Sequence, residues 1–205
     1  MCDPPRLLLI TDPLVCPDIE GSIAAALQGG PFDVVLRNKT ASAHTLTAQA
    51  HRIKALLRST GGRLLIHGRA DIALAVEADG VHLPECGMET SEVRQFIGPN
   101  RLLGRSCHNP ENGRRHLLEG GDYVTLSPVF PTASHPEATP LGLERFSCMR
   151  AQIPGAVLAL GGIQIGNVAD TLRAGATGVA LIRGILNTPD PGFAVQNLLT
   201  HINKN

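Results

Sequence analysis

The sequence predicts an α/β fold, a compact (β/α)8 TIM barrel built from parallel strands. Eight short apolar runs recur along the chain, and each is short enough to be a strand buried on both faces of a sheet. Segments with the spacing of amphipathic helices separate these runs, so strand and helix alternate throughout. A doubly wound open sheet is the competing architecture, and the count of eight strands disfavours it.

The strands are expected where the apolar runs lie, and the helices are expected between them. The expected strands are Leu7–Ile10, Val34–Leu36, Leu64–Ile66, Val81–Leu83, Leu102–Gly104, Tyr123–Leu126, Val157–Leu160 and Val179–Ile182. The expected helices span residues 18–28, 42–58, 71–78, 89–96, 110–119, 143–150, 166–174 and 191–202. Asn109 followed by Pro110 predicts a helix start, because an Asn side chain caps free N–H groups and Pro suits the first helical position.

Length and composition narrow the class of protein. The chain has 205 residues and no Ser/Gly-rich or charged linker, so we expect one domain over residues 1–205. Lys plus Arg and Asp plus Glu number 18 each, and a net charge of zero argues against a nucleic acid or a membrane surface as partner. No stretch approaches the ~18 apolar residues of a membrane span, which favours a soluble cytoplasmic protein. Five scattered cysteines without a Cys-x-x-Cys pair indicate reduced thiols.

The segment that leaves the fifth strand carries residues suited to proton transfer. In a (β/α)8 barrel the active site lies at the carboxyl ends of the strands. Alternation along the strand places Ser106 and His108 on one side and Cys107 on the other. A hydroxyl and an imidazole then meet in the same space. Cys107 is expected in the layer between strands and helices, as inert packing.

Glycines after the last two strands predict a phosphate seat. Gly161 and Gly162 follow the seventh strand, and Ile182, Arg183 and Gly184 follow the eighth. Glycines at these ends of a barrel let backbone N–H groups approach a ligand and form the usual phosphate site. The substrate is therefore expected to carry a phosphate group.

Further motifs stand in a fixed order along the chain. They are Leu9-Ile10-Thr11-Asp12, Leu36-Arg37-Asn38-Lys39, Asp79-Gly80-Val81-His82-Leu83, Ser127-Pro128-Val129-Phe130-Pro131-Thr132, Gly142-Leu143-Glu144 and Leu160-Gly161-Gly162-Ile163. With these motifs the chain resembles, over nearly its whole length, the thiamin phosphate synthase and TenI superfamily. The resemblance implies a (β/α)8 barrel that works on thiazole phosphates in thiamin biosynthesis.

The chain departs from one of the two chemistries of that superfamily. Thiamin phosphate synthases join a pyrimidine diphosphate to a thiazole phosphate, and two aspartates hold the Mg2+ that binds the diphosphate. By resemblance the first position is Gly68 and the second falls at or near Gly87, and a glycine offers a metal no side chain. Glu85 is left as a single candidate ligand and is expected to be a solvated loop acid. The lysine expected near Thr132-Ala133-Ser134-His135 is also absent.

The TenI branch matches more closely. It shares Gly68-Arg69, Leu83-Pro84 and the Gly104–His108 segment. TenI-type proteins resemble thiazole tautomerases, which convert a thiazole carboxylate phosphate into its aromatic isomer. The resemblance makes His108 the proton-transferring residue, and an unperturbed pKa of ~6.5 suits that work near neutral pH. Ser106 would position the imidazole or the substrate carboxylate.

We therefore predict a metal-independent thiazole tautomerase without a cofactor, with His108 and Ser106 as catalytic residues and a thiazole phosphate as substrate. Arg37 and Lys39 are expected to bind the substrate carboxylate, for which the planar arginine fork is suited. The full set of expected substrate-binding residues is Arg37, Lys39, His67, Ser127, Thr132, Gly161, Gly162, Ile182 and Arg183.

Two alternatives stay open. One is a thiamin phosphate synthase with a Mg2+ site rebuilt from Glu85 or another carboxylate. The other is a non-catalytic barrel that binds a thiazole or thiamin phosphate. Barrels of this family are commonly dimeric, so the resemblance implies a homodimer, and it also implies a functional link to thiazole synthase.

The remaining histidines are interpreted as structural or exposed. His82 is expected to be packed or bonded to a neighbouring backbone. His67 and His135 lie near the mouth without the tight spacing of a zinc site. Arg69 is expected to pair with a neighbouring acid. Surface positions on helices are expected for His44, His51, His116 and His201.

Overall fold

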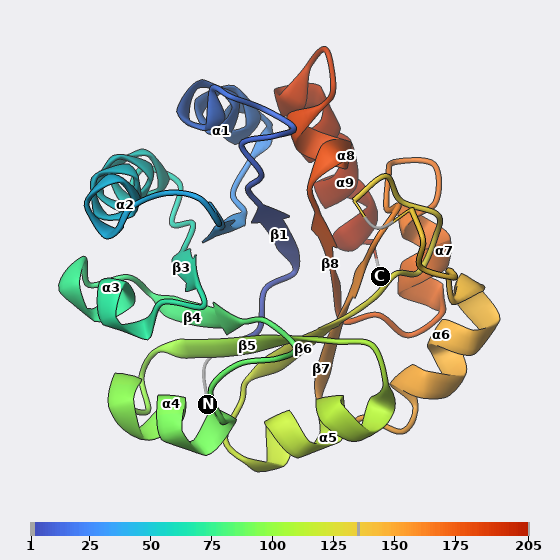
Figure 1. Cartoon of the computed structure of the whole chain (residues 1–205). Helices are drawn as coiled ribbons and strands as arrows, with labels where there is room; N and C mark the ends of the chain where they lie inside the picture. Colours follow the sequence, from blue (N-terminus) through green and yellow to red (C-terminus); the bar gives the residue numbers. More distant parts are fainter. Residues whose placement is uncertain (1–2, 135, 205) are drawn as a thin grey trace.

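The computed structural model describes residues 3–134 and 136–204, in which the strands close into a parallel barrel (Figure 1). The strand order around the barrel follows the chain, and the last strand pairs with the first. His135 lies outside the described residues. The strands are β1 (Leu7–Ile10), β2 (Asp33–Leu36), β3 (Leu64–His67), β4 (Gly80–Leu83), β5 (Leu102–Cys107), β6 (Tyr123–Leu126), β7 (Ala156–Leu160) and β8 (Gly178–Leu181).

Helices follow the strands around the outside of the barrel (Figure 1). They are α1 (Ile19–Ala26), the 3-10 turn η1 (Leu27–Gly29), α2 (Ala43–Leu57), α3 (Ala70–Ala75), α4 (Thr90–Ile97), α5 (Pro110–Leu118), α6 (Gly142–Arg150), α7 (Val168–Arg173), α8 (Arg183–Leu186) and α9 (Pro191–Ile202). The expected alternation is confirmed. The one-turn helix α8 was not predicted, because four residues are too few to show a helical period.

Side chains cap the first turns of α5 and α2. Asn109 precedes α5, and its side-chain oxygen accepts a hydrogen bond from the backbone N–H of Asn112 at 2.8 Å. Ser42 caps α2 in the same way, by accepting from the N–H of Thr45 at 3.1 Å. Both residues satisfy N–H groups that a helix leaves unpaired at its first turn.

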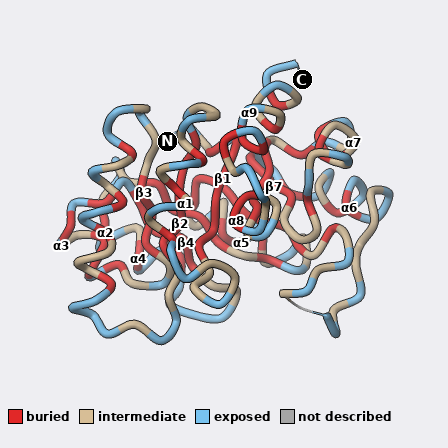
Figure 2. The backbone as a smooth tube through the Cα atoms, turned by 90° about the horizontal axis from the view of Figure 1, so that it is seen from above, coloured by how far each residue is buried: buried red, intermediate tan, exposed pale blue. Residues whose placement is uncertain are grey.

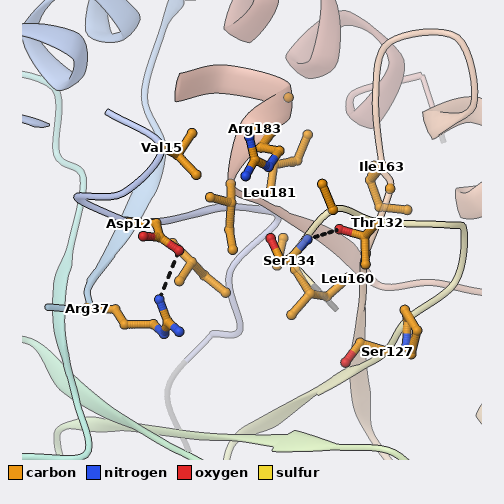
Figure 3. Close-up of a pocket in the computed structure, with 18 of the residues that line it drawn as sticks. Asp12, Val15, Arg37, Ser127, Thr132, Ser134, Leu160, Ile163, Leu181 and Arg183 are labelled. Carbon is orange, nitrogen blue, oxygen red and sulfur yellow. Dashed lines mark hydrogen bonds and ion pairs between the residues drawn. The ribbon is translucent and has the colours of Figure 1, made fainter. Parts of the chain in front are cut away.

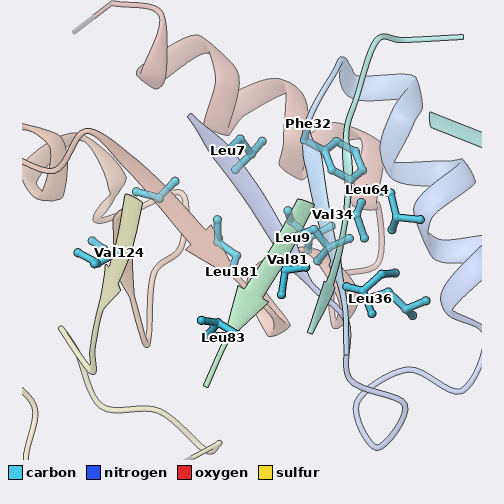
Figure 4. Packing of buried hydrophobic residues seen from close by; sticks show 14 of the residues in the cluster. Leu7, Leu9, Phe32, Val34, Leu36, Leu64, Val81, Leu83, Val124 and Leu181 are labelled. Carbon is cyan, nitrogen blue, oxygen red and sulfur yellow. The ribbon is translucent and has the colours of Figure 1, made fainter. Parts of the chain in front are cut away.

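Strand side chains alternate between two apolar layers. Leu7 and Leu9 of β1 pack in the outer layer, between the strands and the helices (Figure 4). Leu8 and Ile10 pack in the inner layer, inside the barrel. Buried residues accordingly lie in the middle of the fold, and the exposed ones lie on the surrounding helices and loops (Figure 2). Because each buried leucine contributes about 1.5–3 kcal/mol, the two layers hold the barrel ring in place.

The structure corrects the expectation for His116. This histidine is only 1% exposed on α5, where its Nδ1 lies 2.8 Å from the hydroxyl of Thr90 and its Nε2 lies 3.2 Å from the carbonyl of Leu103. The carbonyl only accepts, so Nε2 carries the proton and Nδ1 accepts from Thr90. A polar residue on the inward stripe of a helix is tolerated here because both ring nitrogens have partners.

The structure also gives the positions of Arg69 and of the other histidines that were expected on helix surfaces. Arg69 pairs with Asp71 at 2.6 Å, as expected. His44 and His51 are exposed on α2, while His201 is half-buried.

No helix within residues 3–134 and 136–204 is long and apolar enough to cross a membrane.

Candidate active site

A cavity of about 910 Å³ opens at the carboxyl ends of the strands. Residues at or just after the ends of all the strands line it. Figure 3 labels some of them, among them Asp12, Arg37 and Arg183. The structure brings every site residue predicted from the sequence to this cavity. They are Ser106, His108, Arg37, Lys39, His67, Ser127, Thr132, Gly161, Gly162, Ile182 and Arg183.

The alternation expected along β5 is confirmed. Ser106 and His108 line the cavity, whereas Cys107 is fully buried in the outer layer between strands and helices. Burial raises the pKa of the Cys107 thiol to about 12, so the thiol is not a nucleophile at neutral pH.

His108 is held in one tautomer. Its Nδ1 lies 2.7 Å from the backbone carbonyl of Ser127, and a carbonyl only accepts, so Nδ1 carries the proton. The neutral ring therefore has its free lone pair on Nε2. The side chain is 47% exposed. His108 thus presents a proton acceptor at the mouth while its other nitrogen anchors the ring.

Glu85 lies beside His108, and this corrects the expectation of a solvated loop acid. Its Oε2 is 3.6 Å from Nε2 of His108, and its Oε1 accepts from the backbone N–H of His108 at 3.3 Å. The same oxygen lies 3.4 Å from the amide nitrogen of Asn112. A carboxylate at this distance stabilises the imidazolium that forms when Nε2 takes a proton. The sequence held no signal for this contact, since 23 residues separate the two side chains.

Arg37 is partly neutralised by Asp12, an acid that was not predicted as a site residue. Its Nη1 lies 3.1 Å from Oδ2 of Asp12 (Figure 3). The hydroxyl of Thr11 donates to the Arg37 carbonyl at 3.0 Å and accepts from its N–H at 2.8 Å. These bonds fix the Arg37 backbone against the end of β1. Lys39, further along the same loop, is exposed at the mouth.

Two glycines after β7 form the wall of the cavity that lies across from Arg37 and Lys39. Gly161 and Gly162 have positive φ angles of 97° and 65°, which favour glycine. A Cβ atom would also lie 2.8 Å from Cα of Pro128 at the first position and 2.6 Å from the Pro131 carbonyl at the second. The loop after β6 therefore packs directly on this turn. Arg183 begins α8 on the same side and is exposed (Figure 3).

His67 and His82, on the inner wall of the cavity, are neutral at neutral pH. Burial, followed by the charges of Arg37 and Lys39, lowers the pKa of His67 to about 4. Its ring stacks on that of His82, with centroids 6.2 Å apart. Burial also lowers the pKa of His82 well below its ordinary value. His82 is packed, as expected, and the partners of its two nitrogens are the side chains of Tyr123 and Ser106 instead of a neighbouring backbone.

The fold and the position of the cavity define the class of protein. This is a TIM barrel whose polar site, with one anchored histidine and a glycine turn opposite, lies at the carboxyl ends of the strands. Residues 7–185 match the family model described as thiamine monophosphate synthase, and the chain belongs to this family.

Relatives of known sequence carry related names. The chain is 41% identical over 183 residues to the putative thiamine-phosphate synthase of Geobacter sulfurreducens, covering 89% of this chain and 86% of the relative. It is 38% identical to the thiamine-phosphate synthase of a Roseiflexus species, over 86% of this chain and 75% of that one. The similar thiamine-phosphate synthase of Thermosynechococcus vestitus is 36% identical over 89% of this chain, which spans only 52% of that relative.

Solved structures superpose on this barrel over nearly its whole length. Thiamine phosphate pyrophosphorylase from Pyrococcus furiosus superposes with a TM-score of 0.85 at 28% identity, over 97% of this chain and 96% of that chain. A 3-hexulose-6-phosphate synthase from Salmonella typhimurium superposes with a TM-score of 0.72 at 14% identity, over 97% and 99%. The second likeness is one of fold alone.

The donor set does not fit the magnesium site that the superfamily resemblance implies. Gly68 has a positive φ of 65° and no side chain to offer, and Gly87 likewise lacks a donor. The carboxylates on the cavity wall, Asp12 and Glu85, face Arg37 and His108 respectively. Among the residues described, no group of three or more His, Cys, Asp or Glu side chains is arranged to hold a metal ion.

Proposed function

We propose that this member of the thiamine monophosphate synthase family is a thiazole tautomerase, in which His108 moves a proton on a thiazole carboxylate phosphate without a metal. The observation that carries the proposal is the anchored tautomer of His108. Its Nδ1–H donates to the Ser127 carbonyl at 2.7 Å, and Nε2 is left as the base.

Such a reaction needs only one well-placed acid–base group. Nε2 of His108 takes a proton from one ring position, and the imidazolium then returns a proton to another, so the substrate gains and loses nothing overall. Glu85, 3.6 Å away, stabilises the charged ring between the two transfers. The half-exposed position of His108 suits this exchange, because the ring is accessible to a ligand from the mouth.

The charges at the mouth suit a substrate with two anionic ends. Arg183 and the Gly161–Gly162 turn would hold the phosphate, because backbone N–H groups and an arginine fork both recognise phosphate oxygens. Arg37 and Lys39 on the opposite wall would hold the carboxylate. In this arrangement the thiazole ring spans the cavity between the two walls.

The test is the substitution His108→Asn. We expect it to reduce the rate of tautomerisation by about 10²–10⁴-fold, the usual contribution of an acid–base group. His51→Asn, on the exposed face of α2, is the matched control and should keep the wild-type rate. An unchanged rate in His108→Asn would falsify the assignment.

The names of the relatives favour a second candidate, thiamin phosphate synthase. This transferase would join a pyrimidine diphosphate to a thiazole phosphate in the same cavity. The purified protein should be supplied with both substrates and Mg2+, and the formation of thiamin phosphate measured. Product formation at an enzymatic rate, together with no tautomerisation, would replace the first candidate by the second.

A further inference from the structure

His82 connects two side chains on neighbouring strands and is fully buried on the wall of the cavity. Its Nδ1 lies 3.0 Å from the hydroxyl of Tyr123, and its Nε2 lies 3.0 Å from the hydroxyl of Ser106. The three residues come from β4, β5 and β6, so this polar chain crosses three strands inside the barrel.

Gly104 makes the crossing possible. In the strand register, His82 on β4 pairs with Gly104 on β5, and Gly104 pairs with Tyr123 on β6. A Cβ atom at Gly104 would lie 2.2 Å from Cζ of Tyr123. The missing side chain leaves space for the tyrosine ring to reach over β5, so the His82 and Tyr123 ring centroids are 5.6 Å apart. Ser106 is the next residue of β5 on the same face.

The direction of the hydrogen bonds follows from the needs of the buried hydroxyl. Tyr123 is fully buried, and within the described residues the side-chain partner of its hydroxyl is Nδ1 of His82. A buried O–H group that donates to nothing is costly, so Tyr123 donates and Nδ1 accepts. Burial raises the pKa of Tyr123 well above its ordinary value and lowers that of His82, so one stays protonated and the other neutral. The single proton of the His82 ring is then on Nε2, which donates to Ser106.

This arrangement determines what Ser106 offers to a ligand. Nε2–H of His82 donates to the Ser106 hydroxyl oxygen, and the hydroxyl of Thr125 donates to the same oxygen at 3.5 Å. Both described partners are donors, so the proton of Ser106 is free to point into the cavity that Ser106 lines. We propose that Tyr123 and His82 are positioning residues that hold Ser106 as a hydrogen-bond donor to an anionic oxygen of the ligand. That the ligand is a thiazole carboxylate phosphate rests on the proposed function.

The tautomer of His82 can be measured without any ligand. Long-range proton–nitrogen NMR spectra of the full chain, labelled with 15N-histidine, distinguish a proton on Nε2 from a proton on Nδ1. The His82 signals are assigned by their loss in His82→Asn. We expect the Nε2–H form in the wild type and a shift of population towards the Nδ1–H form in Tyr123→Phe. A wild-type ring with its proton on Nδ1, or a doubly protonated ring at neutral pH, would overturn the proposal.

Binding measurements test whether the two positioning residues act through Ser106. The variants are Ser106→Ala, Tyr123→Phe and the double variant, with the thiazole carboxylate phosphate as the calorimetric probe. Ser106→Ala should weaken binding by about 10–100-fold, as for a lost hydrogen bond to a charged group. Tyr123→Phe should weaken binding in the wild-type background and have no further effect in the Ser106→Ala background. An equal effect in both backgrounds would show that Tyr123 does not act through Ser106.

Two controls keep the outcomes separate. Thr171→Val removes a fully buried hydroxyl on α7, far along the chain from this group, and should change neither the His82 tautomer nor the binding constant. Circular dichroism checks that each variant is folded. A wild type that binds no probe would contradict the proposed function, whereas the NMR result tests the hydrogen-bond chain by itself.

Discussion

Gly104 and Tyr123 are register partners on β5 and β6, and the tyrosine ring occupies the space that a side chain at Gly104 would need. A Cβ atom there would lie 2.2 Å from Cζ of Tyr123. Gly104 thus leaves space for the Tyr123 ring inside the barrel. His108, at the other end of the Gly104–His108 segment, lies at the mouth of the cavity.

The substitution Gly104→Ala should therefore destabilise the fold. We expect it to lower the free energy of unfolding by about 1–3 kcal/mol, the usual cost of overpacking a core. Urea denaturation measures the change. Gly166→Ala is the control, because a Cβ there meets no atom within 4 Å. The cost should shrink in a Tyr123→Leu background, and an equal cost in both backgrounds would contradict the steric explanation.

Glu85 should contribute, through its charge, to the rate of the proposed tautomerisation. The substitution Glu85→Gln keeps a side chain that can accept from the His108 N–H but removes the carboxylate 3.6 Å from Nε2. Because the pair is partly exposed, we expect a modest fall in kcat, about fivefold, with KM nearly unchanged. Steady-state kinetics check this. Glu89→Gln, at an exposed acid near α4, is the control, and an equal fall in both variants would count against a specific role.

Arg94 should be a major stabilising residue on the opposite side of the barrel from the site. It donates to the Gly120 carbonyl at 2.8 Å and pairs at 2.6 Å with Asp122, whose carboxylate also accepts from the Leu103 N–H. Because Asp122 is buried, Arg94→Leu leaves a buried charge without its cation, and we expect a loss of about 3–5 kcal/mol. Arg115→Leu, which breaks long ion pairs of an exposed guanidinium with Glu89 at 3.9 Å and Glu119 at 4.0 Å, should cost about 0–1 kcal/mol. Thermal and urea unfolding that rank the two variants the other way would refute this.

Stability should fall in mild acid because of His116. Burial lowers its pKa from 6.5 to about 4, so between these values the unfolded chain binds a proton that the folded chain does not. Stability is therefore retained above pH 6.5 and lost as the pH falls towards 4, by about 3 kcal/mol for this residue at the acid end.

His116→Gln tests this pH dependence. The difference in unfolding free energy between about pH 7.5 and about pH 4.5 should be smaller in the variant than in the wild type. His44→Gln, at an exposed position on α2, should leave the difference unchanged. If His116→Gln has the same pH dependence as the wild type, the buried histidine is not the cause.

Much of the fold could be predicted because it depends on neighbouring residues. The run Leu7–Ile10 is β1 as expected, and Tyr123–Leu126 is β6, since a continuous apolar run is typical of a strand buried on both faces. Asn109 caps α5 through a contact only three residues long. Alternation along β5 likewise predicted that Ser106 and His108 share one side, and both residues line the cavity.

The partners of the site residues could not be predicted in the same way. Asp12 and Arg37 are 25 residues apart, and His82 and Tyr123 are 41 residues apart. Their contacts depend on strand register and on the closure of the barrel, which no local period encodes. The sequence alone determined the alternating strands and helices, the face on which His108 lies and the glycines at the mouth. The tertiary structure alone decided that Glu85 lies beside His108, that Asp12 pairs with Arg37 and that Tyr123 reaches His82, because distances between side chains exist only once the ring of strands has closed.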